Sequence, residues 1–108
     1  MPASPVLGEP QFAPISSAVA NATLVAAQGA NVKIRVLGFL LVAAAAAVAK
    51  FQSGGVDITG PMSLATGVGI WIDYAPLGVF ETAANALLNL NQTGTVQLSG
   101  WLVWATAS

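Results

Sequence analysis

The sequence predicts an all-β protein: a single β-sandwich domain of the jelly-roll kind behind an extended, proline-rich N-terminal arm. Glycine and asparagine interrupt the chain at intervals of about eight to twelve residues, a spacing typical of sandwiches and barrels. The segments between these turns are rich in β-branched and aromatic residues, and several alternate apolar with polar side chains. We therefore expect an arm over residues 1–20 and a sandwich over residues 21–108.

The arm is expected from its prolines, Pro2, Pro5, Pro10 and Pro14. Proline has no backbone N–H, and a segment with this composition is typical of extended chain without regular structure. We expect residues 1–17 to lack regular secondary structure and to become ordered through contact with another chain or with the flank of the domain.

The first expected strand covers residues 21–27, and the longest covers residues 32–42. The longer strand opens with alternation, because Ile34 and Val36 fall on the opposite face from the charged residues beside them. After Gly38 both faces are apolar, as expected where a strand lies beneath a second layer or a partner chain. Gly38 itself marks a bulge or bend.

The alanine-rich stretch that follows has two interpretations. Intrinsic propensity favours a helix over residues 43–49, but no N-cap residue precedes it. We expect a turn at residues 44–46 and a strand over residues 47–52. Asn85 suits a left-handed turn. The remaining strands are expected at residues 56–59, 62–65, 69–74, 77–82, 86–91 and 95–106.

Charged side chains make up only 6% of the sequence and hydrophobic ones 56%, whereas an ordinary soluble domain is about a quarter charged. A domain of 108 residues exposes much of its surface, so a lone monomer with so few charges would tend to aggregate. We expect the chain to bury surface against other protein chains. A membrane is not the expected partner, because the longest uncharged apolar run, residues 36–49, is shorter than the roughly 20 residues of a spanning helix.

The composition also argues against catalysis and cofactor binding. The chain contains no cysteine and no histidine, which removes disulfides, the common zinc sites and the usual nucleophile–base pairs. A net charge of −1 cannot form the basic surface that nucleic acids require. Asp57, Asp73 and Glu81 fall in separate segments without a calcium-binding loop. We expect no enzyme activity, no cofactor, no metal and no nucleic-acid partner.

The residues expected at a protein interface are aromatic, apolar or paired charges. Trp71, Tyr74, Trp101 and Trp104 can form a platform for a sugar, although core or subunit-contact roles are commoner for aromatic residues. Arg35 is expected to pair with Glu81 or Asp73, unless its head group simply reaches solvent. The candidate interface residues are Phe39, Leu41, Trp71, Trp101, Trp104, Arg35 and Glu81.

Three sequence segments occur in order: NATLVAAQGANVKIRVLGFLLVAA, FQSGGVDITGPMSLATG, and PLGVFETAANALLNLN followed by VQLSGWLVW. Through them the chain resembles small virion proteins of tailed bacteriophages, of the capsid decoration or cement kind. The resemblance implies a β-rich structural protein, a homotrimer, seated on the outer surface of the phage head where major capsid protein subunits meet. The alternatives are a phage tail or fibre component, or a carbohydrate-binding β-sandwich module.

Overall fold

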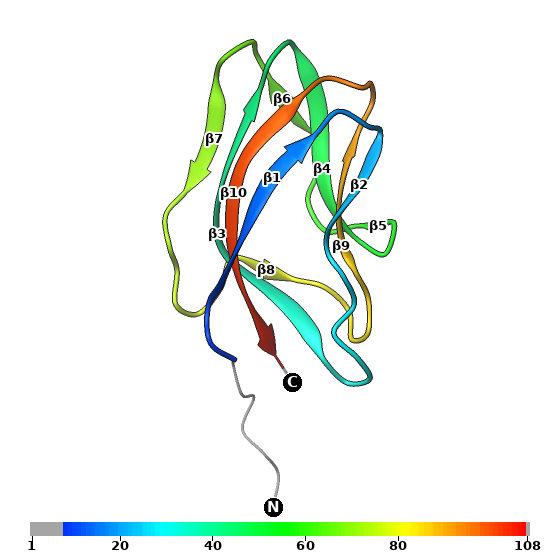
Figure 1. The fold of residues 1–108 in the computed structure, drawn as a ribbon, viewed down its shortest axis with the longest axis vertical. Helices are drawn as coiled ribbons and strands as arrows, with labels where there is room; N and C mark the ends of the chain where they lie inside the picture. The colour runs from blue at the N-terminus through cyan, green and yellow to red at the C-terminus, as the bar shows by residue number, and fades with distance from the viewer. Residues whose placement is uncertain (1–7, 108) are drawn as a thin grey trace, which may run out of the picture.

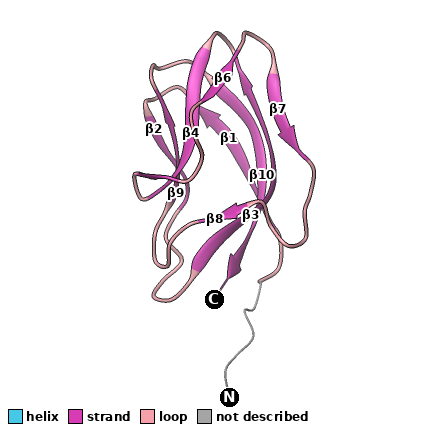
Figure 2. Cartoon of the chain, turned by 180° about the vertical axis from the view of Figure 1, so that it is seen from behind, coloured by secondary structure: helices cyan, strands magenta, loops and turns pink. Residues whose placement is uncertain are grey.

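The computed structural model describes residues 8–107, and these form two antiparallel sheets packed face to face, with no helix among them (Figures 1 and 2). The expected all-β sandwich is therefore confirmed. The first sheet has the strand order β1-β10-β3-β7, with β8 also paired to β3, and the second has the order β2-β9-β4-β5, with β6 paired to β4. Strands β1 to β4 lie alternately in the first and second sheets, β5 and β6 stay in the sheet of β4, and β9 and β10 lie in opposite sheets, which is compatible with a jelly roll.

The strand bounds follow the turn signals of the sequence closely. The first sheet comprises β1 (Gln11–Ser17), β3 (Lys33–Ala43), β7 (Gly69–Ile72), β8 (Phe80–Glu81) and β10 (Leu98–Ala107). The second comprises β2 (Asn21–Val25), β4 (Ala47–Ser53), β5 (Val56–Asp57), β6 (Met62–Leu64) and β9 (Leu88–Gln92). The alanine-rich stretch forms a turn between β3 and β4, as expected, and Asn85 adopts a left-handed φ of 55°.

The N-terminal segment departs from the expectation. Residues 11–17 form β1 and pair with β10 along their whole length, so the expected lack of regular structure is wrong for them, and the sheet begins before residue 21. The physical reason is the position of β1 at the edge of its sheet, where Pro14 can place its ring nitrogen away from the partner strand. The part of the expected arm at residues 1–7 lies outside the described residues.

A β-bulge in β3 decides which side chains enter the core. Val103 pairs with Gly38 while Trp104 pairs with Val36, so Leu37 is an extra residue in β3. Because side chains alternate along a strand, one extra residue exchanges the two faces. Ile34 and Val36 point inward before the bulge, and Phe39 and Leu41 point inward after it; all four are at most 3% exposed.

Both sheets supply the core between them. Phe39 and Phe51 belong to this core and meet edge to face at 4.9 Å between centroids. The half-buried Phe80 packs against the core, 5.2 Å from Phe51. Gly100 lets β10 approach β3 closely, because a Cβ there would overlap the backbone of Leu40 and because its φ is 146°. Side chains from both sheets thus pack together in the core, and the aromatic and polar side chains considered next lie on the outer surface.

Candidate interaction surface

Six outward side chains in the middle of the first sheet form an apolar surface that we call the aromatic face. The register places Pro14, Trp101, Leu40 and Trp71 in one row across β1, β10, β3 and β7, and Phe12 and Val103 in the next row. Phe12 and Trp71 are each 67% exposed, and Pro14 is also exposed, while the other three are half-buried. The aromatic face therefore consists of Phe12, Pro14, Leu40, Trp71, Trp101 and Val103.

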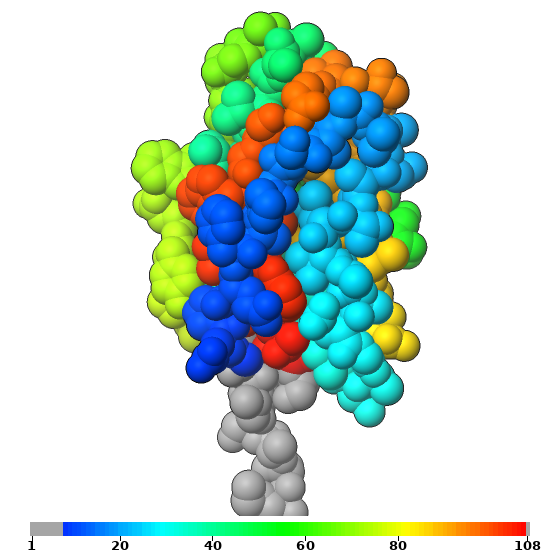
Figure 3. All heavy atoms as spheres, viewed as in Figure 1, coloured from blue at the N-terminus to red at the C-terminus, as the bar shows by residue number. Residues whose placement is uncertain are grey.

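Phe12 and Trp101 stabilise each other on this face. Their rings are stacked, with centroids 6.2 Å apart and planes 27° from parallel. In Figure 3 the side chains of β1 (blue) lie beside those of β10 (orange and red), with β7 and the following loop (yellow-green) at the left edge. An offset aromatic pair of this kind is held in place before any partner arrives.

The loop after β7 extends the apolar surface. It lies against Gly38, where a Cβ would come within 3.2 Å of the backbone of Tyr74, and it is held there by a 2.6 Å hydrogen bond from the Ala75 amide to the Leu37 carbonyl. Tyr74 is 54% exposed and Leu77 is 85% exposed. The bulged, glycine-containing part of β3 thus allows the loop to lie close to the sheet.

Three of the residues expected at an interface are buried, so their expected position on the surface is wrong. Phe39, Leu41 and Trp104 are 3%, 0% and 7% exposed and belong to the core. The bulge turns Phe39 and Leu41 inward, and Trp104 lies opposite Val36 on the inward side of β10. Trp71 and Trp101 do lie together on the outer face, so Trp104 cannot join them in a platform.

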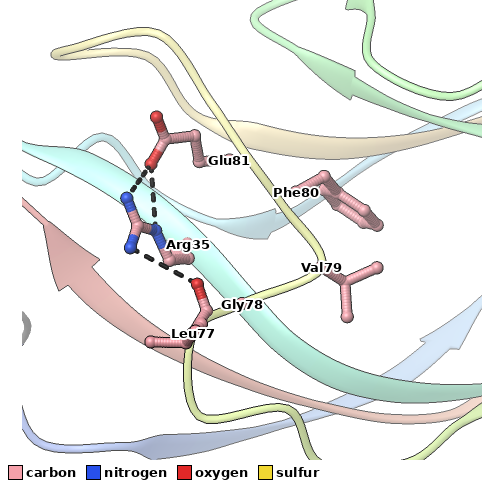
Figure 4. Close-up of a pocket in the computed structure, with 6 residues that line it drawn as sticks. All are labelled: Arg35, Leu77, Gly78, Val79, Phe80 and Glu81. Carbon is pink, nitrogen blue, oxygen red and sulfur yellow. Dashed lines mark hydrogen bonds and ion pairs between the residues drawn. The ribbon is translucent and has the colours of Figure 1, made fainter.

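Arg35 and Glu81 form an ion pair within the chain, as expected for Arg35. The arginine Nη2 and Nε donate to Glu81 Oε2 at 2.8 and 3.0 Å, and Nη1 donates to the Leu77 carbonyl at 3.4 Å (Figure 4). Lys33 Nζ lies 3.4 Å from Glu81 Oε1. These hydrogen bonds, those from Arg35 above all, hold the pKa of Glu81 below its ordinary value. Asp73, the other candidate partner of Arg35, forms no ion pair among the described residues.

An open hollow of ≈ 250 Å³ borders this ion pair and is lined by residues 77–81 together with Arg35 (Figure 4). Arg35 already donates to Glu81 and to the Leu77 carbonyl, and the stem of Arg35 packs against Gly78. The cluster is therefore a structural clamp between β3, β8 and the loop, and its exposed atoms form a charged rim at one end of the first sheet.

The outer face of the second sheet is polar. Asn89 Nδ2 donates to Gln52 Oε1 at 2.9 Å, Gln52 Nε2 donates to Asp57 Oδ1 at 2.8 Å, and Lys50 Nζ donates to Asp57 Oδ2 at 3.1 Å. The hydrogen bond from Gln52 is the main reason that the pKa of Asp57 is lowered. Asn91 adds a 2.7 Å bond to Asn21. The two outer faces of the sandwich thus differ sharply, one apolar and one covered by hydrogen-bonded side chains.

The second sheet also borders an open hollow of ≈ 340 Å³, lined by Asn21, Ala22, Thr23, Gly54, Gly55, Leu87 and Asn89. Asn89, the buried amide in this lining, donates to Gln52 and accepts a 3.2 Å bond from the Gly55 amide. The side chain of Asn89 therefore stabilises the β4–β5 turn, and the hydrogen bonds of its amide group are made within the protein.

Among residues 8–107 there is no group of three metal-ligating side chains. No helix in this part of the chain is long and apolar enough to cross a membrane. Comparison with known proteins found no matching family model, curated protein or solved structure.

Sequence reasoning missed Phe12, because the prolines around it indicated an arm. Its position two residues before Pro14, in an alternating stretch that also contains Ile15, was the available signal. Phe12 is exposed and Ile15 is 2% exposed, as alternation along an edge strand requires.

Proposed function

We propose that this chain is a non-enzymatic virion structural protein of the capsid decoration kind, which self-associates and binds the outer surface of a phage head. One observation carries the proposal: the first sheet carries a group of adjacent uncharged apolar side chains on its outer face, whereas the second sheet carries hydrogen-bonded polar side chains there. Contiguous exposed apolar surface with a polar rim is a common feature of sites where proteins contact one another. The sequence resemblance to decoration proteins points to the same role.

In this proposal the partners are further copies of the chain and the major capsid protein. The resemblance implies a homotrimer at the junctions between capsid subunits. Surface shared among copies would also account for a chain with only 6% charged residues, because interface cores are depleted in charged side chains.

The test is to identify the protein in purified phage particles and to measure its stoichiometry against the major capsid protein by mass spectrometry. We expect a fixed ratio, and we expect purified protein to rebind to heads prepared without it. Absence from the particles would overturn the proposal. Immuno-electron microscopy that places the protein on the tail would select the alternative of a tail or fibre component.

A carbohydrate-binding module is the second candidate, and the exposed Trp71 side chain is the observation that favours it. Sugar recognition also needs polar groups that fix orientation beside the aromatic ring. The only polar groups in the six side chains of the aromatic face are the indole N–H groups of Trp71 and Trp101, so the face itself offers few such groups. Binding of soluble polysaccharides that is lost in Trp71→Ser would support this candidate.

A further inference from the structure

We propose that the aromatic face is the surface through which copies of this chain contact one another. The proposal rests on the self-association proposed above and assigns it to one surface. Phe12 on β1 and Trp71 on β7 lie on the same face of the first sheet at its two opposite edges, and each is 67% exposed. The exposed aromatic surface therefore spans the width of the sheet, whereas scattered single apolar residues on a surface need no partner.

The aromatic face suits a copy of itself because none of its six side chains is charged. Symmetric contacts bring identical surfaces together, so a charged residue in a self-contact tends to meet its own kind. The charged side chains in the strands of this sheet lie at one end, where Lys33 and Arg35 both pair with Glu81. Asp73 is exposed at the edge of the sheet, directly after β7. The arrangement is an apolar centre with a polar rim, which is the usual anatomy of an interface between proteins.

The size of the surface is that of a small contact between copies. Its six side chains occupy positions about 4.8 Å apart across the strands and about 6.7 Å apart along them, which gives a flat footprint of roughly 200 Å². A specific interface buries about 800 Å² on each partner. The loop after β7 enlarges the surface, because Tyr74, Leu77 and Val79 are 54%, 85% and 41% exposed next to the sheet. The total stays below the standard size, so we expect the contact to be a weak one.

The β1 edge of the sheet is a poorer route to self-association. β1 is the edge strand beside β10, and it carries Pro14 near its middle. Proline has no N–H to donate to an added strand, and proline on an edge strand is a common device against pairing between sheets. Contact through the face avoids this obstacle, since it needs side-chain packing and no new backbone hydrogen bonds.

The experiment compares three forms of the full chain by light scattering coupled to gel filtration at about 20 µM, a concentration at which a specific contact is well populated. The first is the wild type, and the second carries Phe12→Ser and Trp71→Ser. The third is a control, Val56→Ser, which removes a 70% exposed apolar side chain from β5 of the other sheet. Thermal melting of each form shows that it is folded.

We expect the wild type and Val56→Ser to be oligomers and the double variant to be a folded monomer, with a dissociation constant raised at least about 100-fold. A dimer and a trimer both support the proposal, because it concerns the surface and not the copy number. A monomeric wild type overturns it, and so does a folded double variant that remains an oligomer. If that oligomeric double variant fails to rebind phage heads, the aromatic face contacts the capsid instead.

The proposed virion role is judged separately. A wild-type oligomer that depends on Phe12 and Trp71 but is absent from phage particles would uphold the self-contact and overturn the decoration role. A wild type that is monomeric in solution but rebinds to phage heads would uphold the decoration role and overturn the self-contact.

Discussion

The Arg35–Glu81 pair offers a quantitative test of the clamp that holds β8 and the loop against β3. The perturbation is a double-mutant cycle of Arg35→Ala, Glu81→Ala and the combined variant. Arg35 places two donors on one carboxylate oxygen at 2.8 and 3.0 Å, and the two side chains are 25% and 32% exposed. The pair is thus partly screened by solvent.

The size of the effect follows from this intermediate burial. Exposed ion pairs contribute about 0.2–1 kcal/mol, and well-made hydrogen bonds to charged groups contribute about 1.5–3 kcal/mol, so we expect a coupling energy of about 1 kcal/mol. Arg35→Ala alone should lower the free energy of unfolding by about 1.5–2 kcal/mol, because the stem of Arg35 also packs against Gly78. Lys33 still faces Glu81 in this variant, so the carboxylate is not stranded.

The assay is urea unfolding at pH 7 and low salt, with all variants at one protein concentration so that self-association contributes equally. The control cycle uses Lys50 and Asp57, whose side chains are 29% and 52% exposed and whose coupling should be smaller. Additive effects of Arg35→Ala and Glu81→Ala would refute the reasoning, as would a coupling no larger than that of the control pair.

Two further predictions concern the backbone of the sandwich and its dependence on pH. Gly100→Ala should destabilise the fold by about 3–5 kcal/mol, because its Cβ would lie 2.7 Å from the carbonyl carbon of Leu40 at a φ of 146°. Gly60 has open space around it, so Gly60→Ala is the control and should change stability by less than about 0.5 kcal/mol in the same urea assay. Equal unfolding midpoints for the two variants would contradict this prediction. The folded-state pKa of Glu81 lies below its ordinary value of 4.5, so the stabilising effect of its carboxylate is present above that pH and is lost as the pH falls. The stability advantage of the wild type over Glu81→Gln should therefore shrink below pH 4.5 in thermal melts across a pH series. An advantage that grows in acid would contradict this prediction.

The sequence predicted which face of a strand enters the core only where the other face of that strand was polar. Lys33 and Arg35 mark the outer face at the start of β3, so the inward direction of Ile34 and Val36 could be read directly. Beyond Gly38 both faces are apolar, and alternation alone does not say which one enters the core. The bulge at Leu37 decides it. Gly38 indicated a bulge or bend at this point, but the residue that is added is set by pairing with β10.

The candidate surface was only partly predictable for the same reason. Trp71 and Trp101 were expected at an interface and lie together on the aromatic face, but Phe39, Leu41 and Trp104 fill the core. Local composition also hid β1, since its proline is compatible with a strand only at a sheet edge, and edges are set by the tertiary fold. Turns were easier, because the φ of Asn85 is a local property.

The central claim is that the aromatic face is covered when the protein is assembled, and hydroxyl-radical footprinting of the wild-type assembly tests it most directly. Side-chain oxidation at Phe12 and Trp71 should be several-fold slower in the assembly than in the folded monomer produced by diluting the wild type. Val56, which is 70% exposed on the second sheet, serves as the reference and should be labelled equally in both. Equal labelling of Phe12 and Trp71 in the two states would contradict the account.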